Sequence, residues 1–251
     1  MPALPSPDVL DGVVLEPHRS AFSERTNLRV GLISDTHIPE ARAELWPQVF
    51  TALAGVDCIL HGGDIHELFV LDQLAEVAPL WSARGNGEDG SAGRPIAPDD
   101  DRLRYSWLLD LAGVRVGLTH DVPMPELPPN YTVERWKLRR FGTADIDVLV
   151  YGDSHVERID IVDGTLCVNP GSPTYPHNLM PQLGTLGFLD IDGRDVRASL
   201  WQLTEDGASG PITELATTVP VAPPADRSAG PPPDRVADPP ADRSSDPEDA
   251  P

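Results

Sequence analysis

With 251 residues, 40% of them apolar, the chain can bury a substantial core, and we expect one globular domain with loose ends. A formal net charge of −21 at pH 7 disfavours nonspecific binding to nucleic acid or to an anionic membrane, because both need clustered Lys and Arg. No apolar run approaches the ~20 residues that span a bilayer, and the N-terminus lacks the basic and apolar regions of a signal peptide. Cys58 and Cys167 lie in predicted buried strands without CxxC spacing, which argues against a disulfide framework or structural zinc, so we expect a soluble, cytoplasmic protein.

An N-terminal extension precedes the first strand. Residues 1–26 mix Pro, Ser and charged residues, and their one apolar patch, at 13–15, is expected to dock a segment on the core. The stretch Leu28–His37, LRVGLISDTH, reads as a buried strand that ends in a polar cluster with Asp35 and His37. Because the carboxyl ends of strands in open α/β sheets face a crevice where ligands bind, both side chains can aim into one site. Taken alone, the pair also fits a turn residue and a loop histidine with satisfied hydrogen bonds.

Helices and strands alternate after this strand, which is typical of a parallel α/β sheet. Two more strands end in ligand-type residues, because HGGD places Asp64 after one of them and RGN places Asn86 after the next. The two glycines before Asp64 let the backbone approach a ligand closely. The expected elements are a helix at 45–53, a strand at 56–60, a helix at 68–77 and a strand at 80–83, followed by a Gly-, Pro- and Asp-rich loop through 101.

The next part of the chain adds two further strand ends of this kind. A strand pair ends at His120, and a later strand runs into GDSH, which contains Asp153 and His155. We expect the domain to span 27–205. Its remaining elements are strands at 103–111, 114–119 and 148–151, a loop at 121–130, a helix at 131–141, a hairpin of 159–162 with 166–168, and strands at 185–191 and 196–203.

Beyond about Thr217 the composition changes to Pro, Ala, Asp and Ser, and the segment PADRS occurs at 224–228 and again at 240–244. None of the ligand-type blocks falls in this part of the sequence. Such a composition buries too little apolar surface to offset its ordering entropy, so we predict a disordered tail at 217–251.

The polar residues at the five strand ends form an ordered set of metal-ligand types. Carboxylate, imidazole and amide oxygen together suit Mn²⁺, Fe²⁺ or Zn²⁺ better than Ca²⁺ or a thiolate-bound metal. In chain order they are Asp35 with His37, Asp64, Asn86, His120, and Asp153 with His155. This order resembles the calcineurin-like metallophosphoesterase superfamily, whose blocks are DxH, GD, GN, a lone His and GHxH. In particular, it resembles the small, uncapped bacterial phosphodiesterases of the YfcE type, which also carry NPGS near the end. The resemblance covers about Leu28–Leu203.

The resemblance implies a fold, a cofactor and a reaction. The fold would be an α/β sandwich of two mixed β-sheets flanked by helices, with the metal site at the carboxyl ends of the strands. The cofactor would be two divalent metal ions, Mn²⁺ first, with Fe²⁺, Ni²⁺ or Zn²⁺ as alternatives. A metal-bridging hydroxide would attack the phosphorus of a phosphate ester, with diesters preferred.

The resemblance also assigns residues to the two ions. The first metal is expected on Asp35, His37, Asp64 and His155, and the second on Asp64, Asn86, His120 and Asp153. Asp64 would bridge the two ions and hold their spacing. Asp64, Asn86 and His120 are the residues expected to carry catalysis.

Two positions depart from the family pattern. Asp153 stands where the family's last block begins with His, so the second metal would meet an additional carboxylate, which favours harder ions. Alternatively, Asp153 is not a ligand and the second metal is weak or absent. Gly87 and Glu88 stand where phosphomonoesterases of the superfamily have the His near the leaving group. Because leaving-group protonation contributes ~10² to 10⁴-fold, its loss should affect substrates with poor leaving groups most.

Further polar residues lie near these blocks. Arg84 could hold a phosphate oxygen through two hydrogen bonds, or pair with a neighbouring carboxylate. His61 and His66 flank the GGD block, and each either touches the site or makes only a local hydrogen bond. His177 is expected to be an exposed loop residue. NPGS at 169–172 is expected to shape the pocket floor through side-chain bonds of its Asn and a turn at its Gly.

A second function, from a different class, fits the same fold. The small retromer subunit resembles this family and has lost effective catalysis, so the chain could instead be a binding or scaffold protein. The complete series of ligand-type blocks favours the enzyme, because a scaffold need not keep polar groups whose burial is costly without a metal. Asp153 and the acidic, Pro-rich tail support the scaffold alternative.

Overall fold

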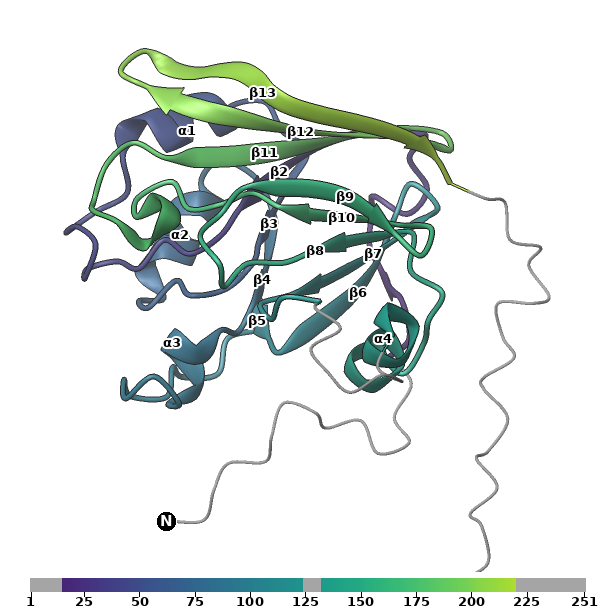
Figure 1. Cartoon of the computed structure of the whole chain (residues 1–251), viewed down its shortest axis with the longest axis horizontal. Helices are drawn as coiled ribbons and strands as arrows, with labels where there is room; N and C mark the ends of the chain where they lie inside the picture. Colours follow the sequence, from purple (N-terminus) through teal and green to yellow (C-terminus); the bar gives the residue numbers. More distant parts are fainter. Residues whose placement is uncertain (1–14, 124–131, 220–251) are drawn as a thin grey trace, which may run out of the picture.

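The computed structural model describes residues 15–123 and 132–219 and shows two mixed β-sheets that face each other (Figure 1). One sheet has seven strands, in the spatial order β13 (Gly207–Thr218), β12 (Asp195–Thr204), β11 (Thr185–Asp192), β2 (Asn27–Ile33), β3 (Cys58–His61), β4 (Leu80–Ala83) and β5 (Leu103–Arg104). The other has six, in the order β1 (His18–Arg19), β6 (Ser106–Leu111), β7 (Val114–Thr119), β8 (Val148–Val150), β10 (Thr165–Asn169) and β9 (Arg158–Val162). The predicted α/β sandwich of two mixed sheets is confirmed.

The side chains of the central strands alternate between two apolar environments. In β3, Cys58 and Leu60 face the core between the sheets, whereas Ile59 packs on the helix side. Val116 of β7 and Val148 of β8 enter the same inter-sheet core from the opposite sheet. Strands β2, β3 and β4 pair in parallel and are covered on both faces, which explains their nearly continuous apolar runs in the sequence.

Helices cover the outer faces of both sheets (Figure 1). They are α1 (Pro47–Leu53) and α2 (Phe69–Ala75) on the seven-stranded sheet and α4 (Val133–Phe141) on the six-stranded sheet. In α4, Trp136 and Phe141 pack against Leu149 of β8. A single helical turn, α3 (Asn86–Asp89), follows β4. None of the helices in the described ranges has the length and apolarity to cross a membrane.

The prediction of one strand over 103–111 is wrong. This segment forms β5 and β6, which belong to different sheets. Leu103 packs on the helix side of the seven-stranded sheet, whereas Trp107 faces the core between the sheets. Trp107 Nε1 also donates a hydrogen bond to the Ser82 carbonyl of β4 at 2.9 Å. The chain therefore crosses between the sheets near Tyr105. The sequence does not reveal the crossing, because Leu103, Tyr105 and Trp107 alternate with polar residues as in one continuous strand.

Part of the N-terminal extension docks on the core, as predicted. Leu15 packs against the cluster under α4, and its N–H donates to the Phe141 carbonyl at 3.0 Å. Strand β1 then pairs with β6 in parallel. Residues 13 and 14 of the predicted apolar patch lie outside the described residues.

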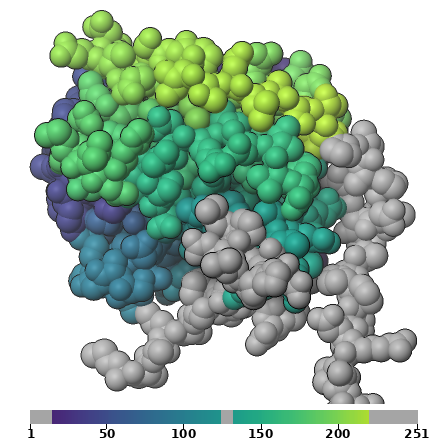
Figure 2. Space-filling view, in the orientation of Figure 1, coloured from purple at the N-terminus to yellow at the C-terminus, as the bar shows by residue number. Residues whose placement is uncertain are grey.

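At the other end, β13 is a strand that the sequence pattern did not indicate. It pairs antiparallel with β12 and carries the sheet past residue 205 to Thr218. Its side chains form a band along the top of the molecule (Figure 2). The tail was predicted to begin at 217, and this start is wrong, because Thr217 and Thr218 belong to β13 and Val219 is buried. Residues 220–251 lie outside the described residues, as does 124–131 between β7 and α4.

Candidate metal centre

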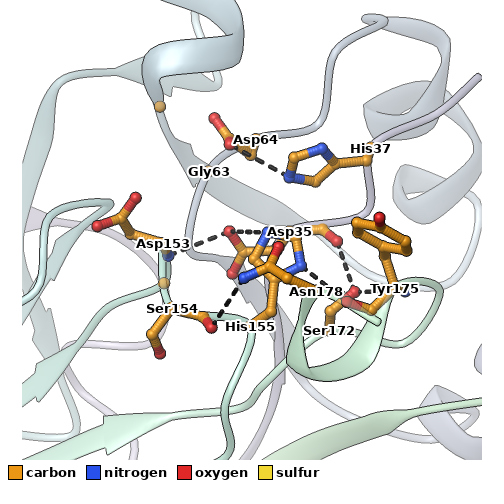
Figure 3. A network of polar contacts seen from close by, with 12 residues as sticks. Asp35, His37, Gly63, Asp64, Asp153, Ser154, His155, Ser172, Tyr175 and Asn178 are labelled. Carbon is orange, nitrogen blue, oxygen red and sulfur yellow. Dashed lines mark hydrogen bonds and ion pairs between the residues drawn. The ribbon is translucent and has the colours of Figure 1, made fainter. Parts of the chain in front are cut away.

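The loops that follow β2, β3, β4, β7 and β8 come together at one end of the sheets. Figure 3 shows the part of this site around Asp35, Asp64 and His155. Backbone hydrogen bonds join them, because Asp35 N–H donates to the Gly63 carbonyl at 2.9 Å and Gly152 N–H donates to the His120 carbonyl at 3.0 Å. The structure thereby brings together all the residues predicted as metal ligands: Asp35, His37, Asp64, Asn86, His120, Asp153 and His155.

Six residues in the loops after β2, β3 and β8 have left-handed backbone conformations, which residues other than glycine rarely adopt. Their φ angles lie between 47° and 70°, and they form three pairs with one residue between the members: Asp35 and His37, Asp64 and His66, Asp153 and His155. Such conformations cost of order 1–3 kcal/mol each and cluster at functional sites, where surrounding contacts hold them. Here they let both members of each pair contribute to one cluster of polar groups.

Asp35, His37 and His155 form a first group, with one candidate ligand atom of each within 4.8 Å of the others. His155 Nε2 lies 3.6 Å from Asp35 Oδ1, and His37 Nε2 lies 3.2 Å from Asp64 Oδ2. Asp35 Oδ1 also accepts the Asp153 N–H at 3.1 Å. The group therefore offers carboxylate oxygen and imidazole nitrogen at the spacing of a shared ion.

His120 lies at the centre of a second group. Its Nε2 is 3.0 Å from Asn86 Oδ1, 3.4 Å from Asp64 Oδ1 and 3.7 Å from Asp153 Oδ1. The Asp153 side chain is 51% exposed, whereas those of Asp64 and His120 are buried. Because the two oxygens of Asp64 face His37 and His120 respectively, this carboxylate links the two groups.

Carbonyl oxygens orient two of the imidazoles from their far side. His120 Nδ1 lies 2.8 Å from the Gly62 carbonyl, and His155 Nδ1 lies 2.8 Å from the Tyr175 carbonyl. A carbonyl only accepts, so in the neutral ring Nδ1 carries the proton and Nε2 keeps its lone pair for the centre of the site. Metal-binding histidines are commonly held in this way.

Asp35 Oδ2, a buried atom at this centre, has no hydrogen-bond partner among the described residues, and the buried His37 Nε2 faces only the Asp64 carboxylate, at 3.2 Å. An unsatisfied buried polar group costs about 1–3 kcal/mol. A divalent cation would satisfy both atoms, and a donor set of carboxylate, imidazole and amide oxygen suits Mn²⁺, Fe²⁺ or Zn²⁺. The residues present therefore fit a divalent metal centre.

The clustered groups shift one another's protonation. Burial raises the pKa of Asp35 above the ordinary carboxyl value. Burial also opposes ionisation of Asp64, but the His37 contact and the potential of His120 hold the pKa of Asp64 below the usual range. Burial disfavours a charged His120, yet the surrounding carboxylates, Asp35 first, raise the pKa of this ring. The site thus concentrates negative charge that a bound cation would offset.

Two glycines permit the close approach of the loops. A Cβ atom at Gly85 would overlap Asp64 Oδ1, and one at Gly63 would lie 2.7 Å from His120 Nδ1. Gly63 also has a φ of 99°, which a larger residue rarely adopts. The glycines beside Asp64 and Asn86 in the sequence therefore make room for the carboxylate and the ring.

The NPGS segment shapes the floor of the site, as predicted. Asn169 Nδ2 donates to the Gly152 carbonyl at 2.8 Å, and Asn169 Oδ1 accepts the Gly171 N–H at 2.9 Å. Ser172 Oγ donates to the Asp35 carbonyl at 2.7 Å (Figure 3). These bonds tie the loop after β10 to the loops after β2 and β8.

Arg84 and Glu88 hold loop backbone. Arg84 Nη1 donates to the carbonyls of Glu88 and Ala97, each at 3.0 Å, and neither a phosphate nor a carboxylate contact is needed to explain its position. The buried Glu88 carboxylate accepts the N–H of Asp64 at 3.0 Å and that of Gly85 at 2.8 Å. This role of Glu88 was missed from the sequence. Its signal is a Glu three residues after Gly85, where a helix's third residue commonly accepts the N–H of the residue that precedes the helix.

Three histidines outside the predicted ligand set differ in position. His61 Nδ1 accepts a backbone N–H two residues further on at 3.1 Å, a local bond at a strand end. His177 is the exposed loop residue that was predicted, and its Nε2 lies 2.9 Å from Glu157 Oε2. His66 lies against the site, with its ring centroid 4.2 Å from that of His37.

Comparison with known proteins agrees with this fold and site. The calcineurin-like phosphoesterase superfamily domain matches residues 28–194. A probable metallophosphoesterase of Methanothermobacter thermautotrophicus is 33% identical over 172 residues, which cover 68% of this chain and 90% of that protein. One from Methanocaldococcus jannaschii is 32% identical over 161 residues, which cover 63% of this chain and 75% of that protein.

A solved structure, that of vacuolar protein sorting 29 from Cryptosporidium parvum, has the same fold. It is 20% identical, has a TM-score of 0.61, and the match covers 77% of this chain and all of that one. With more than half of its length matched by that domain and a third of its aligned residues shared with such a relative, the chain belongs to the calcineurin-like phosphoesterase superfamily.

Proposed function

We propose that this chain is a phosphoesterase that depends on divalent metal ions and prefers phosphodiesters. The observation that carries the proposal is the buried, unpartnered Asp35 Oδ2 within a cluster of carboxylates and imidazoles. We infer a first ion on Asp35, His37, Asp64 and His155 and a second on Asp64, Asn86, His120 and Asp153, with Mn²⁺ first and Fe²⁺, Ni²⁺ or Zn²⁺ as alternatives. When bound, two such ions bind phosphate oxygens, lower the pKa of a bridging water and offset the charge that develops during attack on phosphorus.

Asp64, Asn86 and His120 are proposed to carry catalysis. Asp64 faces both groups of ligands, so its carboxylate would set the spacing between them. His120 is oriented by the Gly62 carbonyl, and its Nε2 lies against Asn86 Oδ1 at 3.0 Å. The bond to the Gly62 carbonyl keeps the His120 ring in place before substrate arrives, which lowers the cost of organising the site during the reaction.

The preference for diesters rests on the side of the site next to Asn86. Gly87 offers no side chain there, and the Glu88 carboxylate is occupied by backbone N–H groups, Asp64 among them. A leaving group would therefore gain little protonation from this segment. That loss matters least for esters whose leaving group is already stable.

A scaffold role is the second candidate, since the fold of vacuolar protein sorting 29 is shared. Fold likeness alone does not separate the two functions. Asp35 is completely buried and one of its oxygens has no partner, which supports the enzyme. In a scaffold without metal, the burial of this carboxylate would lower stability and serve no function. A cytoplasmic location remains our proposal, supported by the free, buried thiols of Cys58 and Cys167.

Metal analysis combined with hydrolysis assays tests the proposal. Purified protein should contain a divalent ion, and exhaustive chelation should abolish hydrolysis of bis(4-nitrophenyl) phosphate while circular dichroism stays unchanged. Added Mn²⁺ should restore activity. 4-Nitrophenyl phosphate, a monoester with the same leaving group, should be hydrolysed more slowly. Asp64→Asn should remove activity, whereas Asp163→Asn, at an exposed hairpin turn, should not.

Full activity after chelation would rule out a metal-dependent mechanism. Protein that binds metal but hydrolyses neither ester would favour the scaffold role. Faster hydrolysis of the monoester than of the diester would remove the substrate preference and leave the metal centre standing.

A further inference from the structure

His66 lies beside the proposed centre without belonging to its ligand set. Its side chain is only 7% exposed, and it shares the left-handed conformation of Asp64, two residues before it. His37 has two imidazole neighbours at similar distances, because its ring centroid is 4.6 Å from that of His155 and 4.2 Å from that of His66. One ring nitrogen each of His37 and His66 and one carboxylate oxygen of Asp64 lie within 4.8 Å of one another.

A carboxylate orients the His66 ring. His66 Nδ1 lies 2.6 Å from Glu40 Oε2, and Arg94 pairs with the other oxygen of Glu40. Arg94 also donates to the His66 carbonyl at 3.3 Å, so it contacts both the Glu40 side chain and the His66 backbone. In the neutral ring Nδ1–H donates to Glu40 and Nε2 keeps a lone pair, the same arrangement that carbonyls impose on His120 and His155.

His61, the other histidine beside this block, has the opposite arrangement. Its Nδ1 accepts the Gly63 N–H at 3.1 Å, so its proton is on Nε2, which faces Thr36 Oγ1 at 3.2 Å. Both nitrogens are therefore occupied. Of the two histidines that flank GGD, His66 alone has a ring nitrogen left for a ligand.

The space for His66 depends on Gly87. A Cβ atom at Gly87 would overlap His66 Cδ2, and it would lie 2.7 Å from His66 Nε2 and 3.1 Å from Asp64 Oδ1. The Nε2 edge of the ring is thus turned toward Gly87, on the side of Asp64. A side chain at position 87 would exclude the imidazole from this place.

We propose that His66 is an additional ligand of the ion that His37 and Asp64 help to hold, with Glu40 as the carboxylate that orients it. The proposal rests on the metal centre proposed above and adds one imidazole to it. Metal–nitrogen bonds of about 2.0–2.1 Å place two imidazole nitrogens on one ion about 3–4 Å apart, within the spacing that the cluster allows. A third imidazole beside those of His37 and His155 shifts the preference of this position toward Zn²⁺, Fe²⁺ or Ni²⁺ relative to Mn²⁺.

Binding of Co²⁺ to the apo protein, followed by its visible absorption, tests this ligand directly. His66→Ala should weaken one of the two Co²⁺ equivalents by at least about 10-fold and change its absorption band, because the number of nitrogen ligands falls. Glu40→Gln should weaken the same equivalent by a smaller factor. His177→Ala is the matched control, since His177 also pairs with a glutamate but lies outside the cluster, and it should bind like the wild type.

The outcomes separate this proposal from the function above. Wild-type protein that binds no Co²⁺ would overturn the metal centre itself. Wild-type binding with unchanged affinities and spectra in His66→Ala would overturn only the role of His66, as would an effect confined to the KM for the diester. If His66→Ala lacks the circular dichroism of the folded protein, Glu40→Gln decides, and a wild-type affinity in that variant counts against the proposal.

Discussion

Asp153 contributes to the site through its backbone and through its side chain. Its N–H donates to Asp35 Oδ1 at 3.1 Å, a contact that does not depend on the carboxylate. Its Oδ1 lies 3.7 Å from His120 Nε2, and this contact depends on the carboxylate. Its φ of 70° favours residues that tolerate a left-handed backbone, of which Asn is one. Substitution therefore separates the charge from the loop conformation.

Asp153→Ala should lower the affinity for one metal equivalent by at least about 10-fold, because the second proposed ion loses a charged ligand. The equivalent on Asp35, His37 and His155 should remain, and activity should recover in part at high metal concentration. Asp153→Asn is the conformational control, and Asp153→His should keep both equivalents with a lower pH optimum, since less carboxylate charge leaves the metal more electrophilic. Calorimetric titration with Mn²⁺ measures the affinities. Two intact equivalents and near-normal activity in Asp153→Ala would mean that the second site, including Asn86 and His120, has to be reassigned.

Single residues differ in how far the sequence predicts them. Asp64 and His120 could be found because each follows an apolar strand, and strand ends in such sheets meet at one edge. The role of Glu88 depends on which backbone N–H groups the folded loop leaves free, and no strand pattern records this. The carbonyl partner of Arg84 at Ala97 belongs to a segment without periodicity, so it could not be predicted either.

Strand β13 shows what the apolar pattern misses at the scale of elements. Most of its side chains are exposed, and it is held mainly by backbone pairing with β12, so it has no buried face to produce an alternating pattern. The division of 103–111 into β5 and β6 is missed for a different reason, since the alternation of Leu103, Tyr105 and Trp107 with polar residues continues through the crossing. The β2, β3 and β8 strands were predictable because covered strands are short apolar runs with polar ends.

Two truncations distinguish β13 from the residues that follow it. A chain that ends at Val219 should keep the activity and stability of the full protein, because 220–251 has neither apolar periodicity nor ligand-type blocks. A chain that ends at Glu205 loses β13, with the buried Val219 and the partly buried Leu215, and its free energy of unfolding should fall by about 2–5 kcal/mol. Urea unfolding followed by circular dichroism measures both. Equal midpoints for the two truncations, or a melting temperature several degrees lower at Val219, would contradict this division.

At the scale of the whole molecule, each sheet contains one buried thiol, whose reactivity shows whether that sheet is folded. Burial raises the pKa of Cys58 in β3 to about 12 and that of Cys167 in β10 to about 11. An unfolded thiol titrates near 8.5, so the unfolded chain releases protons above that pH while the folded one keeps them. These two groups therefore lower stability as pH rises from about 8.5 towards the folded pKa values, and have no such effect below it.

Iodoacetamide should accordingly leave both thiols of the native protein unmodified at pH 8 over a period that fully labels the protein in urea. Between pH 8 and 10, the rate for the unfolded chain should increase with its thiolate fraction, while that of the native protein should stay limited by unfolding. Mass spectrometry counts the adducts. Rapid single labelling of native protein would show that one of the sheets opens on its own.

The three pairs of left-handed residues belong to loops that hydrogen-bond to one another, so none of the loops can relax while its neighbours stay in place. Their backbone amides should then open as one cooperative unit, and removal of metal should speed hydrogen exchange at residues 35–37, 64–66 and 153–155 together while the strand interiors remain slow. Exchange that rises in one loop alone would show independent motion. If the three loops open only together, their opening limits how fast metal binds. The rate at which apo protein captures an ion would then follow the exchange rate of these amides and would be the same for different ions.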